Sequence, residues 1–148
     1  MITFESDIRI ERALEEVFAY VSDPLEFPRW NSAVEAVHRS SEGENGVAST
    51  YSMERQLPTG RAVNKLEIVT RAWPREFAIR TTSGPTPFHY RYRFSRENGE
   101  TVVRLSAEVE LQGAAAFLPQ LARRAVTRGV DDNLATLKEI LEASDRRE

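Results

Sequence analysis

The fold is decided by residues 114–143, which read AAAFLPQLARRAVTRGVDDNLATLKEILEA. Apolar side chains recur in this stretch at helical spacing, while arginines and acids take the other side. The stripe consists of Phe117, Leu121, Ala125, Gly129, Val130, Leu134, Leu137 and Leu141. At about 1.5 Å per residue, one helix over this stretch would run roughly 40 Å. A stripe of that length needs a long apolar partner surface, which the rest of the chain is expected to supply.

The preceding chain contains a series of segments that alternate between apolar and polar residues, as strands with one buried face do. These predicted strands are residues 3–10, 34–39, 47–57, 61–71, 76–82, 88–94 and 101–111. Before residue 114, helical spacing is found only between the first and second predicted strands, over 11–21 and 25–30. Short connections favour antiparallel pairing, and one apolar face per strand favours a sheet covered on one side. The sequence therefore predicts a curved antiparallel sheet closed over the C-terminal helix.

Composition limits the class of protein. A chain of 148 residues predicts a single domain over 1–148, with a frayed tail at 144–148. The absence of cysteine excludes disulfides and thiolate chemistry. Because there is neither a signal-peptide pattern nor a long apolar run, we expect a cytoplasmic protein without stable membrane insertion. A net charge of −3 with interspersed acids and bases argues against a nucleic-acid partner.

The first strand is followed by a recognisable series of short motifs. They are Val17-Phe18 in the first helix, then Asp23-Pro24, then Pro28-Arg29-Trp30-Asn31. Residues 8–31 thereby resemble the opening of the START-related, Bet v 1-like (SRPBCC) superfamily, and in particular its polyketide cyclase/dehydrase and lipid-transport branch. The segments 46–53 and 57–60 and the order of elements are also similar.

This resemblance implies an α+β helix-grip fold. In that fold a seven-stranded curved antiparallel sheet wraps a long C-terminal helix, and two short helices lie between strands one and two. A cavity between sheet and helix commonly holds an apolar ligand. Fold alone does not settle function, because members of the superfamily include carriers, binders and enzymes.

The inward side of the predicted strands supplies the candidate wall of a ligand site. Its members are Tyr51, Met53, Leu66, Ile68, Phe77, Ile79, Phe88, Tyr90, Tyr92, Val103, Leu105 and Ala107. The helix would face them with Leu121, Ala125 and Gly129, and Trp30 would lie at the mouth. Glycine inside a helix costs about 1 kcal/mol relative to alanine, so Gly129 suggests a need for clearance. The same pattern also fits a solid core, with Trp30 as a packing anchor.

Tyr51, Tyr90 and Tyr92 are the polar members of this wall. A buried tyrosine needs a partner for its hydroxyl, and a few such groups in an apolar pocket are typical of ligand sites. The alternative is that these hydroxyls reach the rim or a backbone carbonyl. His38 and His89 are expected at the surface or the rim.

Three functions fit these features. The first is binding of a small hydrophobic or amphipathic molecule, lipid-like or polyketide-like, by a monomer or homodimer. The second is a polyketide cyclase, dehydrase or aromatase that uses the same pocket, which would require a positioned proton-transfer group. The third is a protein-interaction module with a filled interior and no ligand. The sequence predicts no catalytic residue, no metal ligand and no cofactor.

Overall fold

The computed structural model describes residues 1–42, 46–57 and 60–145, and of residues 114, 144 and 145 only the backbone. Strands and helices follow one another as β1 (Ile2–Ile10), α1 (Leu14–Val21), η1 (Pro24–Glu26), α2 (Phe27–Trp30), β2 (Val34–Arg39), β3 (Thr50–Leu57), β4 (Gly60–Ala72), β5 (Glu76–Ser83), β6 (Phe88–Glu97), β7 (Glu100–Val109), η2 (Gly113–Phe117) and α3 (Pro119–Asp145). This is the predicted order: one strand, two short helices, six strands and a long helix.

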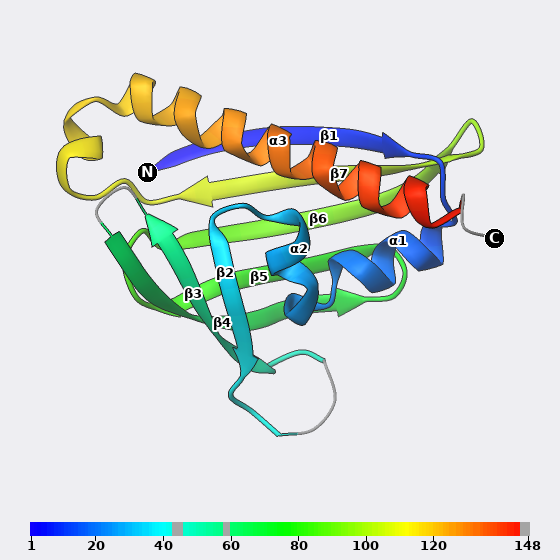
Figure 1. The fold of residues 1–148 in the computed structure, drawn as a ribbon, viewed down its shortest axis with the longest axis horizontal. Coiled ribbons are helices and arrows are strands. Elements are labelled where there is room, and N and C mark those ends of the chain that lie inside the picture. Colours follow the sequence, from blue (N-terminus) through cyan, green and yellow to red (C-terminus); the bar gives the residue numbers. More distant parts are fainter. Residues whose placement is uncertain (43–45, 58–59, 146–148) are drawn as a thin grey trace.

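All seven strands form one antiparallel sheet in the order β1-β7-β6-β5-β4-β3-β2. Strands β2 to β7 pair with their neighbours in sequence, and β1 returns to pair with β7, so β1 and β2 are the edges. Helix α3 runs along β1 and β7, while α1 and α2 lie beside its C-terminal half (Figure 1). The helix-grip arrangement predicted from the sequence is therefore confirmed.

The core lies between the inner face of the sheet and the helices. From α3 it takes Val130, Leu134, Leu137 and Leu141, all of them buried. Their spacing of three and four residues places them on one side of the helix. Helix α1 contributes Val17, Phe18 and Val21 by the same rule.

The predicted start of the long helix was wrong. Residues Gly113–Phe117 form the short 3-10 helix η2, and the backbone of Leu118 is not helical (φ −130°, ψ 62°). A residue before proline avoids the helical region, so α3 begins at Pro119. The predicted stripe is also not covered along its whole length, because Phe117, Leu118 and Leu121 are 85%, 59% and 63% exposed.

The remaining differences are small. Strand β3 begins at Thr50 rather than at residue 47, after Ala48 in a left-handed conformation (φ 71°), and β7 ends at Val109. Parts of the predicted loops at 40–46 and 57–60, and the end of the predicted tail at 144–148, lie outside the described residues. None of the described helices combines the length and the apolar character needed to span a membrane.

Candidate ligand-binding cavity

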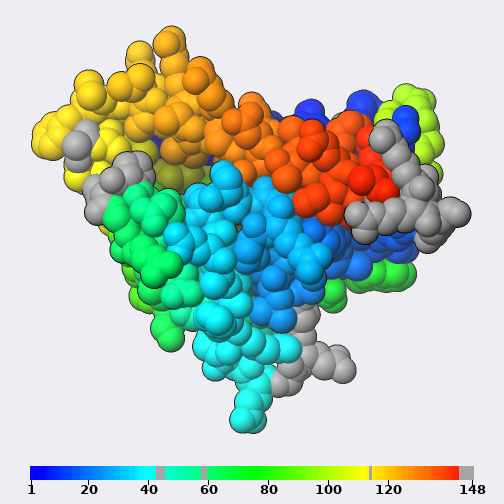
Figure 2. Space-filling model, viewed as in Figure 1, coloured from blue at the N-terminus to red at the C-terminus, as the bar shows by residue number. Residues whose placement is uncertain are grey.

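A cavity of about 290 Å³ lies between α3, the α2–β2 connection and the sheet. Figure 2 shows a recess where the first half of α3 faces β2 and β3. The cavity is lined by Trp30, Asn31, Ala33, Arg55, Gln56, Leu57, Tyr90, Tyr92, Leu105, Ala125, Val126, Gly129, Val130, Asn133 and Leu134. An extension of about 30 Å³ shares part of this wall and is also lined by Phe27, Val34, Met53, Ile79 and Phe88.

Helix α3 forms one wall with residues spaced three and four apart, and two of them are small. Ala125 and Gly129 leave room that larger side chains would fill, and a Cβ added at Gly129 would meet no atom within 4 Å outside its own helix. The Asn133 side-chain oxygen accepts hydrogen bonds from the Ser32 backbone N–H (3.2 Å) and hydroxyl (3.4 Å). These bonds hold α3 to the α2–β2 connection and thereby set the width of the opening.

The opposite wall is aromatic and comes from β6 and α2. Phe88, Tyr90 and Tyr92 alternate along β6 and point inward, as the strand pattern predicts, because successive side chains of a strand face opposite sides. Trp30, at the end of α2, contacts Tyr92 edge to face with ring centroids 6.4 Å apart. It also packs against Phe27 at 5.8 Å. Trp30 is thus both a packing anchor and part of the cavity wall.

Three polar groups in this wall have no hydrogen-bond partner among the described residues. The Trp30 indole nitrogen is fully buried and donates to nothing. The hydroxyls of Tyr90 and Tyr92 are likewise in no hydrogen bond within the described parts of the chain. Burial raises the pKa of both hydroxyls, and the nearby Arg55 guanidinium opposes part of the rise at Tyr90. Both tyrosines are therefore neutral donors at physiological pH.

Arg55, which was not among the predicted site residues, is a half-buried arginine in the wall of the cavity and of its extension. Its Nη1 donates to the Asn64 side-chain oxygen (3.1 Å) and to the Thr86 carbonyl (3.5 Å). Its guanidinium carbon lies 5.5 Å from the centre of the Phe88 ring. The signal for Arg55 was present in the sequence, because it shares the inward parity of Tyr51 and Met53 on β3.

The sixteen predicted residues of the wall, the helix face and the mouth fall into three groups. Trp30, Tyr90, Tyr92, Leu105, Ala125 and Gly129 line the cavity, and Met53, Ile79 and Phe88 line the extension. A second group is at most 2% exposed and lines neither space, because large side chains fill the interior there: Tyr51, Leu66, Ile68, Phe77, Val103 and Ala107. Leu121 lies outside the cavity on the exposed part of α3. That any of these residues contacts a ligand stays a prediction.

Other titratable groups lie outside the cavity. His38 is exposed, with its Nε2 3.6 Å from the Glu54 carboxylate, and the His89 Nδ1 lies 3.8 Å from Glu108. Within the described residues, no group of three His, Cys, Asp or Glu side chains could hold a metal ion.

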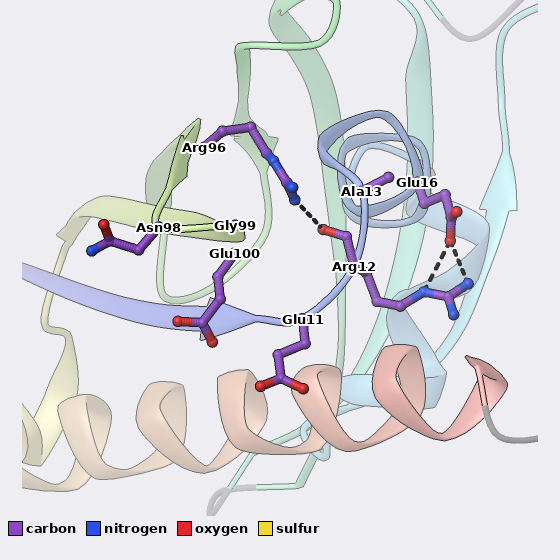
Figure 3. A pocket seen from close by; sticks show the side chains of 8 residues that line it. All are labelled: Glu11, Arg12, Ala13, Glu16, Arg96, Asn98, Gly99 and Glu100. Carbon is purple, nitrogen blue, oxygen red and sulfur yellow. Dashed lines mark hydrogen bonds and ion pairs between the residues drawn. The ribbon is translucent and has the colours of Figure 1, made fainter.

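A separate depression at the β6–β7 hairpin and the start of α1 is polar (Figure 3). Two of its arginines make contacts within it. Arg96 donates to the Arg12 carbonyl at 3.1 Å, and Arg12 pairs with Glu16. These contacts explain the depression as a structural feature that joins the hairpin to α1.

Comparison with known proteins places this geometry in a family. A family model described as polyketide cyclase/dehydrase and lipid transport matches residues 1–142. Among curated proteins, none matches the chain.

Several solved structures share the fold. TTHA0849 from Thermus thermophilus is similar with a TM-score of 0.82 and 16% identity, over 97% of this chain and 99% of that chain. A START superfamily protein from Mycobacterium smegmatis has a TM-score of 0.75 and 14% identity, over 95% and 97% of the two chains. The di-domain ARO/CYC StfQ from the steffimycin biosynthetic pathway has a TM-score of 0.77 and 14% identity, over 97% of this chain and 51% of that one.

Identities this low show the fold alone, whereas the family model covers nearly the whole sequence. On that match, the chain belongs to the polyketide cyclase/dehydrase and lipid-transport family.

Proposed function

We propose that the protein binds a small amphipathic molecule in the cavity between α3, α2 and the sheet. The observation that carries this proposal is the unfilled space itself, whose wall combines apolar side chains with two tyrosine hydroxyls that have no hydrogen-bond partner among the described residues. Ligand sites are typically apolar clefts with a few oriented polar groups. At about 290 Å³ the cavity lies near the lower end of the usual range of about 300–1,000 Å³, so a compact ligand is favoured.

The energetics of the wall support this function. Leu105, Val126 and Leu134 offer apolar surface, and burial of ligand hydrocarbon contributes roughly 25 cal/mol per Å² before the costs of association. The Tyr90 hydroxyl, on a side chain that lines the same cavity, donates to no described residue. A ligand oxygen that accepts from it would add a hydrogen bond to the apolar contacts. Such an acceptor on an apolar body describes an amphipathic molecule.

Binding is favoured over catalysis by the titratable groups of the wall. Catalysis of a cyclisation or dehydration needs a group that can transfer a proton near neutral pH. The titratable side chains among the described lining residues are Arg55, Tyr90 and Tyr92. Because burial raises the pKa of both tyrosines, neither is suited to act as a base at that pH.

The experiment is a fluorescence titration with the neutral apolar probe N-phenyl-1-naphthylamine. We expect wild-type protein to bind the probe and Gly129→Leu to bind it at least about tenfold more weakly, since the new side chain enters the cavity. Ala135→Leu is the matched control, because it adds leucine on the exposed side of the same helix.

Thermal unfolding of both variants shows whether they are folded. Equal binding by Gly129→Leu and Ala135→Leu, or no binding by the wild type, would contradict the proposed function.

A further inference from the structure

The guanidinium of Arg55 has no ionic partner in the described parts of the chain. Other arginines on the sheet are paired with carboxylates, such as Arg61 with Glu35 at 2.6 Å and Arg80 with Glu67 at 2.9 Å. Those pairs lie on exposed surface. Arg55 is half-buried in the cavity wall, so its charge is neither paired nor fully hydrated.

Arg55 is held in place from one side. Within the described residues, its only hydrogen bonds run from Nη1, to the side-chain oxygen of Asn64 and to the Thr86 carbonyl. Asn64 is itself fully buried and oriented, because its amide nitrogen donates to the carbonyls of Ser83 (3.2 Å) and Pro85 (2.8 Å). The ring of Phe88 supports the guanidinium at 5.5 Å. This network fixes the head group before any ligand arrives.

The remaining nitrogens of Arg55, Nε and Nη2, donate to no atom of the described residues. Nε and one Nη of a guanidinium form an edge with two parallel N–H groups, which matches the two oxygens of a carboxylate. Tyr90 lines the same cavity and extension as Arg55, and its ring lies 4.5 Å from the Phe88 ring that supports the guanidinium. Its hydroxyl has no hydrogen-bond partner in the described chain either. A carboxylate at Arg55 would thus meet three unused donors.

Burial makes such a partner favourable. Desolvation lowers the pKa of Arg55, which means that the site disfavours the unpaired cation. A bound anion would restore the missing electrostatic stabilisation in a place where water does so only partly.

We propose that the ligand is a monocarboxylate with a compact apolar body, whose carboxylate pairs with Arg55 and accepts a hydrogen bond from Tyr90. This inference rests on the proposed function and names the chemical class of its ligand. The apolar body would lie against Trp30, Leu105 and α3, and the acid would lie at the β3–β6 side of the cavity.

The experiment compares two probes of nearly equal shape, 2-naphthoic acid and the neutral 2-naphthamide, by isothermal titration calorimetry. We expect wild-type protein to bind the acid at least about tenfold more tightly than the amide. In Arg55→Gln the affinity for the acid should fall at least about tenfold, and the affinity for the amide should change less than about threefold. Retained amide binding shows that the variant keeps its cavity.

Arg61→Gln is the matched control. It removes an exposed arginine from the adjacent strand β4 and changes the net charge equally, so the preference for the acid should remain. A second measurement uses the wild-type protein, so it does not depend on the stability of a variant. The ¹⁵N–¹H NMR signal of Arg55 Nε, assigned by its absence in Arg55→Lys, should shift when the acid is added and should not shift when the amide is added.

The outcomes separate this inference from the proposed function. Equal affinity for acid and amide, or a preference that survives Arg55→Gln, would overturn the assignment of a carboxylate and leave the binding function standing. Absence of binding by both probes, together with absence of binding by N-phenyl-1-naphthylamine, would overturn both. Loss of acid preference in Arg61→Gln as well would show a general effect of charge and also refute the role of Arg55.

Discussion

Replacement of single glycines by alanine tests the backbone that holds Arg55. Gly84 lies in the β5–β6 turn with φ +101°, and a Cβ there would be 2.4 Å from the Val63 carbonyl oxygen and 2.7 Å from the Asn64 amide nitrogen. Asn64 orients Arg55, so this turn supports the cavity wall. Gly84→Ala should therefore reduce both the stability of the fold and the affinity for an acid.

The magnitude can be worked out in two parts. A non-glycine residue in a sparsely populated backbone region costs about 1–3 kcal/mol. A contact as short as 2.4 Å with backbone forces a shift, and overpacking of that kind costs about 1–3 kcal/mol more. The total is roughly 2–6 kcal/mol. At about 2–4 °C per kcal/mol for a chain of this size, Tm should fall by at least about 4 °C.

Two matched substitutions separate the backbone cost from the cost of the close contact. Gly99, in the β6–β7 hairpin, has φ +80° but open space around its Cβ position, so Gly99→Ala should show the backbone cost alone. Gly129 is helical and unobstructed outside its own helix, so Gly129→Ala should stabilise the protein by about 1 kcal/mol. Urea unfolding measures all three. If Gly84→Ala lowers the free energy of unfolding no more than Gly99→Ala does, the close contact inferred at Gly84 would be refuted.

Two further predictions concern the tyrosines and α3. Burial raises the pKa of all four tyrosines above the ordinary value of 10. Above pH 10 the unfolded chain therefore releases protons that the folded state retains. The contribution of the tyrosines to the free energy of unfolding should be constant below pH 10 and should fall as the pH rises towards the folded-state pKa values. A phenolate absorbance titration that finds native tyrosines ionising at pH 10 would refute this. In α3, Leu134→Ala should cost about 2–5 kcal/mol because Leu134 is 1% exposed, whereas Leu121→Ser should stay within about 0.5 kcal/mol because Leu121 is 63% exposed. Equal losses in chemical denaturation would contradict the described position of the helix.

The sequence was a good guide where a single period governs burial. Alternation over residues 88–94 placed Phe88, Tyr90 and Tyr92 on the inner face, because the two-residue period of a strand leaves little choice. The same alternation identified each of the seven strands and so gave the order of the elements. The family resemblance then added that all seven strands form one sheet wrapped around the helix, which periodicity alone does not specify.

The sequence was a poor guide where packing or local geometry decides. Phe117 and Leu121 continue the apolar stripe of α3, yet nothing in their spacing shows that their side chains are 85% and 63% exposed. Inward parity likewise could not separate Phe77, which packs in the filled core, from Tyr92, which lines the cavity, because that depends on which neighbours fill the space. Arg55 shares the inward parity of the wall, but a pattern of apolar and aromatic residues does not include a charged side chain.

The uneven burial of α3 has a consequence for its motion. From Val130 onwards the helix is part of the core, whereas Leu121 in its first turn, like Phe117 and Leu118 just before the helix, already lies in solvent. Opening the first turns therefore exposes little additional apolar surface, while opening the last turns requires much of the core to separate. Amide hydrogen exchange should accordingly be fast near Leu121 and should slow towards Leu137, where it approaches the rate of global unfolding. One continuous helix thus has a gradient of local stability along its length, and the cavity, which contacts residues 125–134, lies between the end that opens easily and the end that is held in the core.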